Sequence, residues 1–192
     1  MNDPLALLAH DRARARAARD PWADLCVLAT LADTQPQART LVLRDVDGRP
    51  AIFMNATSPK HSQIRTRPDV AMVIYLASCG VQYRMDGVLE PIRTEIVHTH
   101  WRARPRIPKV MDWFYREHAP QSAVFESRAA LEAAHAHLDA RLGHDPHAPE
   151  EASGHFIVAS VVDRLELASD RIHERVRFRR AADSWVREIL VP

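Results

Sequence analysis

The sequence predicts a mostly β fold of the α+β class, with helices around the strands. Short runs of aliphatic and β-branched residues alternate with turn residues along much of the chain, as in strands. Asp47-Gly48 separates two such runs, which is a strong β-hairpin signal. Similar runs return in the last third, from Phe156 onward.

The first half of the chain is predicted to alternate between strands and two helices. Residues 4–19 are expected to form an amphipathic helix whose four arginines face solvent. A second helix is expected to begin at Ser58, because serine suits an N-cap and Pro59 suits the first helical position, and to end near Pro68. The predicted strands are 25–31, 38–44, 51–55, 70–76 and 81–90.

The second half is predicted to hold two longer helices and then further strands. Residues 94–104 are expected to be helical, with Pro105 and Pro108 as breaks, and an Ala-rich helix covers 126–142. The predicted strands are 156–162, 164–168, 176–179 and 185–190. The expectation is one domain over residues 1–192, with an N-terminal helix and a helical insert at about 94–142.

Composition narrows the functional classes. The 192 residues fit one domain, and a formal net charge of +1 disfavours a general nucleic-acid binder. The chain shows neither a membrane-spanning apolar run nor a signal-peptide pattern, so a cytoplasmic protein is expected. Cys26 and Cys79 do not indicate a disulfide framework, and irregularly spaced histidines do not indicate a metal site. Five scattered glycines exclude a Rossmann fingerprint and a P-loop.

A phosphate site is one interpretation of the segment from Arg39 to Lys60. Lys60 is placed at the start of a predicted helix, where free backbone N–H groups hold anions. Arg39 and Arg44 belong to the preceding strand, but their alternation places them on opposite faces. The alternative is that these arginines are solvated or form surface ion pairs.

Several segments resemble, in order and spacing, the pyridoxine/pyridoxamine 5′-phosphate oxidase family. They read ARTLVLR, FMNATSPK, GVQYRMDG, RARP, APQS and RIHER, and they cover most of the chain. The resemblance implies an FMN-binding split β-barrel that works as a homodimer. It also implies cofactor contacts from Arg39, Thr40, Leu41, Val42, Asn55, Ser58, Lys60, Gln82, Gln121, Ser122 and Arg175.

The resemblance implies a second group of residues that contact the substrate: Arg44, His100, Arg104, Arg171 and His173. Strand alternation is expected to place Arg171, His173 and Arg175 on one face. The chain departs from the family at this group, because His100 stands where relatives have a tyrosine and Pro108 where they have a serine. Pro59 also replaces an arginine, and the family's tryptophan loop before Arg171 is missing.

The resemblance therefore implies an FMN-dependent oxidoreductase that acts on a small anionic substrate, with no nucleic-acid or membrane partner. The alternatives are an authentic pyridoxine/pyridoxamine 5′-phosphate oxidase and a non-catalytic flavin-binding protein. A barrel that binds a deazaflavin or haem is a further class. The catalytic residues, the substrate and the electron acceptor are not fixed by the sequence.

Overall fold

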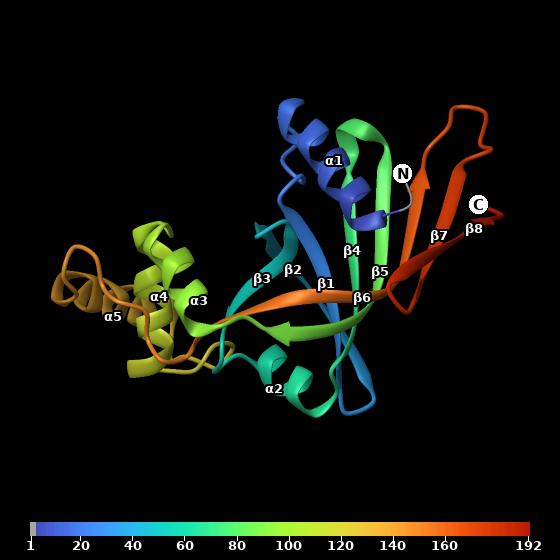
Figure 1. The fold of residues 1–192 in the computed structure, drawn as a ribbon. Coiled ribbons are helices and arrows are strands. Elements are labelled where there is room, and N and C mark those ends of the chain that lie inside the picture. The colour runs from blue at the N-terminus through green and yellow to red at the C-terminus, as the bar shows by residue number, and fades with distance from the viewer. Residues whose placement is uncertain (1–2) are drawn as a thin grey trace. The chain divides into compact units, whose positions relative to one another are not determined.

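The computed structural model describes residues 3–192, which form eight strands, five α-helices and one short 3₁₀ helix. The α-helices are α1 Pro4–Ala17, α2 Pro59–Thr66, α3 Thr94–Arg102, α4 Arg106–Glu117 and α5 Arg128–Arg141, with η1 at Ala77–Cys79. The strands are β1 Leu25–Ala32, β2 Gln35–Val46, β3 Arg49–Asn55, β4 Asp69–Leu76, β5 Val81–Pro91, β6 Ala152–Glu166, β7 Glu174–Ala181 and β8 Ser184–Leu190. Figure 1 shows their arrangement along the chain.

The strands form one sheet in the order β3-β2-β1-β4-β5-β6-β7-β8. An additional pairing of β3 with β6 closes the first six into a barrel, with β7 and β8 continuing beyond β6 (Figure 1). The fold is mostly β, as the sequence pattern predicts, and has the split-barrel form that the resemblance implies. The β2–β3 hairpin also forms as predicted, with left-handed φ angles of 50° at Asp47 and 75° at Gly48.

The described chain divides into two compact units. The first holds the chain up to Ile52, Arg67–Glu90 and Phe156–Pro192, and it contains most of the sheet together with α1. Its core includes the fully buried side chains of Leu28, Leu43, Met72, Tyr83 and Phe178. The second unit holds Phe53–Thr66 and Pro91–His155, and it contains α2 to α5. A smaller core of Val110, Phe114 and Leu138 packs α4 against α5.

The helix at the N-terminus differs from the prediction in one respect. Arg12, expected on a solvated face, is 1% exposed. Its guanidinium donates to the carboxylates of Asp24 and Asp45 and to two backbone carbonyls of the first unit. A buried arginine is stable here because these acceptors replace its hydration. The periodicity of a helix cannot reveal such acceptors, because they come from other elements.

Two predictions in the second half are wrong. Pro108 does not break a helix but lies in the first turn of α4, where a missing N–H removes no intrahelical hydrogen bond. Residues 156–162 and 164–168 are not separate strands, because β6 runs unbroken from Ala152 to Glu166. Pairing with β7 from Val161 to Glu166 carries the strand across the polar Asp163-Arg164 step.

None of the helices in residues 3–192 combines the length and hydrophobicity that crossing a bilayer requires.

Candidate functional site

The predicted site residues fall into both units of the chain, and each set is described within its own unit. The second unit holds Asn55, Ser58, Lys60, His100, Arg104, Gln121 and Ser122. The first unit holds Arg39, Thr40, Leu41, Val42, Arg44, Gln82, Arg171, His173 and Arg175.

In the second unit, predicted cofactor residues are joined by hydrogen bonds. The Lys60 ammonium donates to Oε1 of Gln121 at 3.0 Å, and the Gln121 backbone N–H donates to the Thr57 hydroxyl at 3.4 Å. That hydroxyl donates in turn to Oδ1 of Asn55 at 2.7 Å. The structure therefore brings Lys60, Gln121 and Asn55 together around Thr57.

The same chain of bonds continues to a predicted substrate residue. Nδ2 of Asn55 donates to Oδ1 of Asp112 at 3.2 Å, and Nη1 of Arg104 donates to Oδ2 of Asp112 at 2.5 Å. We call this connected set, Lys60, Gln121, Thr57, Asn55, Asp112 and Arg104, the Lys60–Arg104 relay. It links the predicted cofactor group to the predicted substrate group within one unit.

Sequence reasoning missed two members of the relay. The contact of Thr57 with Asn55 could have been predicted, because an asparagine can accept from the backbone N–H two residues after it, and this bond is 2.9 Å long. No feature of the sequence predicts the contacts of Asp112. It lies within the aromatic segment of α4 and is 5% exposed. Only the folded positions of Asn55 and Arg104 give its carboxylate a role.

The start of α2 provides the features of an anion site. Pro59 at its first position has no N–H, and the His61 N–H donates to the Ser58 carbonyl at 3.0 Å, so the helix offers an anion its positive dipole end together with nearby side chains. Ser58, just before the helix, is 1% exposed, and its buried hydroxyl has no hydrogen-bond partner among residues 3–192. Because an unpaired buried hydroxyl is costly, a ligand oxygen is a natural partner for it. Lys60 is also buried, with 8% exposure.

The charge at this helix end comes from Lys60 rather than from the nearby histidines. Burial lowers the pKa of His155 to about 4, and the charge of His61 acts in the same direction. Burial, followed by the charges of Arg65 and Lys60, lowers the pKa of His61. Both rings are therefore neutral at pH 7. Nδ1 of His155 is also buried without a partner among the described residues.

Two predicted residues beside the relay have distinct surroundings. The ring of His100 lies 5.1 Å from the ring of Phe53. Ser122 follows Gln121 with a left-handed φ of 71°, which is uncommon for a residue other than glycine. Strain of this kind is often found at ligand-binding positions.

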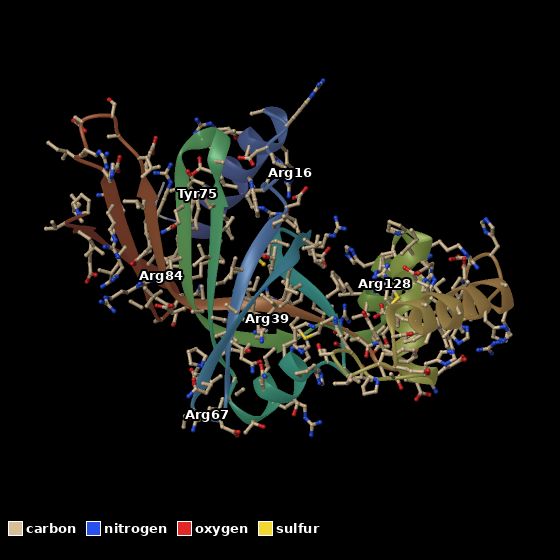
Figure 2. All side chains as sticks on the ribbon, turned by 180° about the vertical axis from the view of Figure 1, so that it is seen from behind. Arg16, Arg39, Arg67, Tyr75, Arg84 and Arg128 are labelled. Carbon is tan, nitrogen blue, oxygen red and sulfur yellow. The ribbon has the colours of Figure 1, made fainter. Side chains whose placement is uncertain are left out.

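In the first unit, the side chains of β2 alternate between a half-buried and an exposed face, as predicted. Arg39 is half-buried with Leu41, whereas Thr40, Val42 and Arg44 are exposed on the other face. Nη1 of Arg39 donates to the Thr30 hydroxyl at 2.6 Å and to the Leu28 carbonyl at 3.3 Å. Arg39 is labelled in Figure 2.

Arg175 belongs to a cluster that the sequence did not reveal. The carboxylate of Asp163, 5% exposed, lies within 3.2 Å of Arg84, 3.2 Å of Arg175 and 2.8 Å of Arg177. We call these four residues the Asp163 cluster. Burial opposes ionisation of Asp163, but hydrogen bonds from Arg177 and Arg175 hold its pKa below the ordinary value. Arg84, which is labelled in Figure 2, belongs to β5 and follows Gln82 by two residues.

The RIHER segment does not have the predicted geometry. Residues 171–173 lie outside a strand, since β7 begins at Glu174, and Arg171 has a left-handed φ of 68°. Strand alternation therefore does not place Arg171, His173 and Arg175 on one face. Nδ1 of His173 accepts the backbone N–H of Ala168 at 3.0 Å, so this histidine closes a turn.

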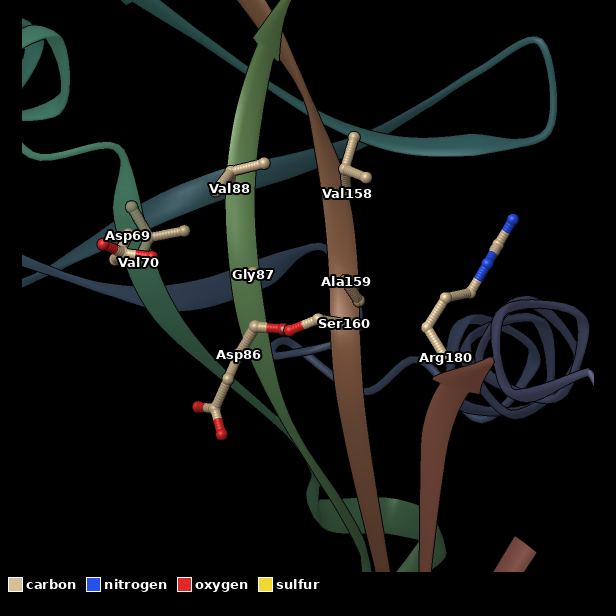
Figure 3. Close-up of a pocket in the computed structure, with 9 residues that line it drawn as sticks. All are labelled: Asp69, Val70, Asp86, Gly87, Val88, Val158, Ala159, Ser160 and Arg180. Atoms are coloured by element: carbon tan, nitrogen blue, oxygen red, sulfur yellow. The ribbon is translucent and has the colours of Figure 1, made fainter. Parts of the chain in front are cut away.

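A pocket of about 470 Å³ in the first unit lies over β4 to β7, with Asp69, Asp86, Ser160 and Arg180 among its lining residues (Figure 3). It includes none of the predicted site residues. Gly87 lies on its floor, where an added Cβ would fall 2.1 Å from the Val158 carbonyl oxygen. Among residues 3–192, no group of three His, Cys, Asp or Glu side chains is placed to hold a metal ion.

Two solved structures share this fold. One is PhzG from Burkholderia lata 383 in complex with tetrahydrophenazine-1-carboxylic acid, with a TM-score of 0.90, 24% identity, and coverage of 100% of this chain and 94% of PhzG. The other, from Nostoc punctiforme, is described as a pyridoxamine 5′-phosphate oxidase-related, FMN binding protein. Its TM-score is 0.77 at 20% identity, over 97% of this chain and 96% of that one. At these identities the likeness establishes the fold.

Sequence comparisons establish the family. The family model described as pyridoxamine 5′-phosphate oxidase matches residues 17–140. A pyridoxine/pyridoxamine 5′-phosphate oxidase from Nocardioides sp. is 32% identical over 99% of this chain and 88% of its own length. One from Pseudomonas putida is 30% identical over 88% of this chain and 79% of its own. The chain belongs to the pyridoxamine 5′-phosphate oxidase family.

Proposed function

We propose that the protein is an FMN-dependent oxidoreductase that acts as a homodimer on a small anionic substrate. The comparisons indicate FMN as the cofactor. The proposal treats residues 1–192 as one FMN-binding domain and keeps the predicted cytoplasmic location. The observation that carries it is the start of α2, where Lys60 and the unpartnered hydroxyl of Ser58 lie together at a helix N-terminus.

These residues fit the phosphate of FMN. The proposal assigns the phosphate to the side chains of Ser58 and Lys60, because a dianion is stabilised by the positive end of a helix dipole and by an ammonium group. Gln121 orients the Lys60 ammonium through the 3.0 Å hydrogen bond. The other predicted cofactor residues, Arg39 to Val42, Asn55, Gln82, Ser122 and Arg175, remain part of the proposal. When bound, FMN supplies the redox chemistry, and the protein supplies position and charge.

The test of this assignment compares FMN with riboflavin, which lacks the phosphate. We expect FMN to bind at least tenfold more tightly, since one charge-assisted hydrogen bond contributes about 1.5–3 kcal/mol. Quenching of flavin fluorescence on titration with the apoprotein measures both affinities. Equal affinities would contradict a phosphate site at α2.

The proposed substrate contacts come from Arg44, His100, Arg104, Arg171 and His173. Support for a small anionic substrate comes from PhzG, whose bound ligand is a carboxylic acid. His100 offers only an imidazole and Pro108 offers no donor, so we expect slow oxidation of pyridoxamine 5′-phosphate. Anaerobic reduction of the bound FMN by this compound, followed by reoxidation in air, measures the rate. Rapid turnover at micromolar concentration would instead identify an authentic vitamin oxidase.

An exposed apolar surface in the first unit supports the homodimer. Val27, Val42 and Tyr75 are 38%, 45% and 44% exposed, and a pocket of about 170 Å³ lies among Val27, Tyr75 and Trp22. Apolar surface of this kind marks interfaces when it is contiguous. We expect a dimer in sedimentation, and Tyr75→Glu should shift it toward monomer. A wild-type monomer with FMN fully bound would contradict this part of the proposal.

A non-catalytic flavin-binding protein is the second candidate. The observation that favours it is the engagement of Arg104 by Asp112, which leaves this arginine less available to a substrate. This candidate would be supported if neither pyridoxamine 5′-phosphate nor other small anionic reductants reduced the FMN of a dimeric, fully loaded protein.

A further inference from the structure

Asp112 has a buried carboxylate that forms an ion pair with Arg104. Its side chain is 7% exposed, whereas that of Arg104 is 32% exposed. Oδ2 lies 2.5 Å from Nη1 of Arg104, and Oδ1 accepts from Asn55 at 3.2 Å. Both oxygens are therefore engaged, and Asn55 holds the carboxylate in place beside the arginine.

The pair has no net charge when both groups are ionised. A phosphate dianion that approached Arg104 would also approach the fixed negative charge of Asp112, in a partly buried setting where screening by water is weak. A singly charged or neutral ligand meets less repulsion. The electrostatics of this position therefore discriminate by ligand charge rather than by size.

Arg104 nevertheless keeps hydrogen-bonding capacity. A guanidinium has five N–H donors, and the bond to Asp112 uses one of those on Nη1. The Trp101 ring, 5.1 Å from Cζ of Arg104, adds a flat apolar neighbour. The part of the guanidinium that remains exposed suits a carboxylate or carbonyl oxygen.

We propose that Asp112 is a specificity-determining residue: it neutralises Arg104, so the substrate group received there is a carboxylate or a neutral carbonyl and not a phosphate dianion. This inference rests on the proposed function, in which Arg104 contacts the substrate. It concerns the substrate class, and it does not depend on the rate of any reaction.

The experiment uses two ligands that differ only in the phosphate and have no oxidisable group at C4′, 4-deoxypyridoxine 5′-phosphate and 4-deoxypyridoxine. Their dissociation constants are measured by calorimetry on the FMN-loaded protein, and their ratio gives the phosphate preference. For the wild type we expect a ratio below ten. Asp112→Asn keeps the shape of the side chain and its bond with Asn55 but removes the charge. It should raise the ratio at least tenfold, and adding Arg104→Gln to this variant should abolish the gain.

Asp145→Asn is the matched control. Asp145, like Asp112, is paired with a cation, at 2.6 Å from Lys109 of α4, but its side chain is 62% exposed. This change removes the same charge and should leave the ratio unaltered. A comparable rise in Asp145→Asn would show that net charge alone explains the effect and would overturn the inference.

Other outcomes are also decisive. A wild-type ratio above ten, or an unchanged ratio in a folded, FMN-loaded Asp112→Asn protein, would overturn the inference while leaving the proposed function intact. If Asp112→Asn does not fold, the wild-type ratio alone decides, on the same threshold of ten. Failure to load FMN, read from the absorption spectrum, would instead contradict the proposed function.

Discussion

Two arginine clusters of the first unit show different uses of buried charge. Arg12 meets four acceptors, two carboxylates and two carbonyls, at 2.5–3.0 Å. The Asp163 cluster has the opposite ratio of cations to acceptors, since three guanidinium groups share the Asp163 carboxylate and Arg84 also pairs with Asp86, at 3.7 Å. Nε of Arg84 is buried and has no partner among residues 3–192. The comparison indicates that saturated cations hold the fold together, whereas unsaturated ones have capacity for an anionic ligand.

The largest expected effect comes from breaking the saturated cluster. Arg12→Met should lower the free energy of unfolding by about 3 kcal/mol, because it leaves Asp24, Asp45 and two carbonyls without their donor. Breaking a buried ion pair costs about 3–5 kcal/mol. The lower value applies here because the two carboxylates are 47% and 38% exposed and keep Arg16 as a partner. Urea unfolding measures this value.

Arg14→Met is the control for Arg12, because Arg14 lies on the same helix with a 53% exposed side chain, and its partner Asp11, at 3.3 Å, would keep its bonds with Tyr83 and Arg164. It should change the free energy of unfolding by less than about 0.5 kcal/mol. Equal losses in the two variants would remove the distinction between saturated and solvated arginines.

The second effect concerns Lys60, the cation that the proposal assigns to the phosphate of FMN. Lys60→Met should weaken FMN binding by about 1.5–3 kcal/mol, the contribution of a charge-assisted hydrogen bond. Lys109→Met is matched in chemistry and burial, but Lys109 is bonded to Asp145 and to the Arg102 carbonyl. It should affect stability rather than FMN affinity. Titration with FMN and urea unfolding of both variants separate the two roles, and the reverse pattern would contradict the assignment.

The smallest effect is pH-dependent and tests the Asp163 cluster. The folded-state pKa of Asp163 is lowered, so its bonds stabilise the protein above its unfolded pKa, near 4, and this stability is lost as the pH falls through the lower folded value. Asp163→Asn should therefore cost about 1.5 kcal/mol at pH 7, at the low end because the arginines are partly exposed, and less at pH 3.

The relevant quantity for Asp163 is the difference between variant and wild type at each pH, measured by urea unfolding. His155, which is neutral when buried, also costs stability in acid but does so in both proteins. A difference that stays constant from pH 7 to pH 3 would show that the carboxylate charge does not stabilise the cluster.

Local signals in the sequence were sufficient for most of the fold. The Asp47-Gly48 turn, the helix start at Pro59 and the alternation of β2 depend on neighbouring residues, and all three are confirmed. The hydroxyl of Ser58, predicted as an N-cap, makes no capping hydrogen bond among the described residues. The RIHER segment failed because strand alternation was applied to a turn, where His173 bonds the backbone of Ala168.

Contacts between distant residues account for the parts of the candidate site that sequence reasoning missed. Asp112 is 57 residues from Asn55 and 8 from Arg104, and no periodicity relates the three. Arg12 was misassigned for the same reason, since its acceptors come from beyond its own helix. The roles of the predicted site residues themselves stay predictions.

The backbone at Ser122 has a consequence for evolution and engineering. A serine with a φ of 71° carries a conformational cost of about 1 kcal/mol or more that glycine would not carry. Ser122→Gly should thus raise the melting temperature. Serine at this exposed, strained position provides a hydroxyl at a cost in stability. Such a cost is expected where a side chain is selected for binding a ligand rather than for stability.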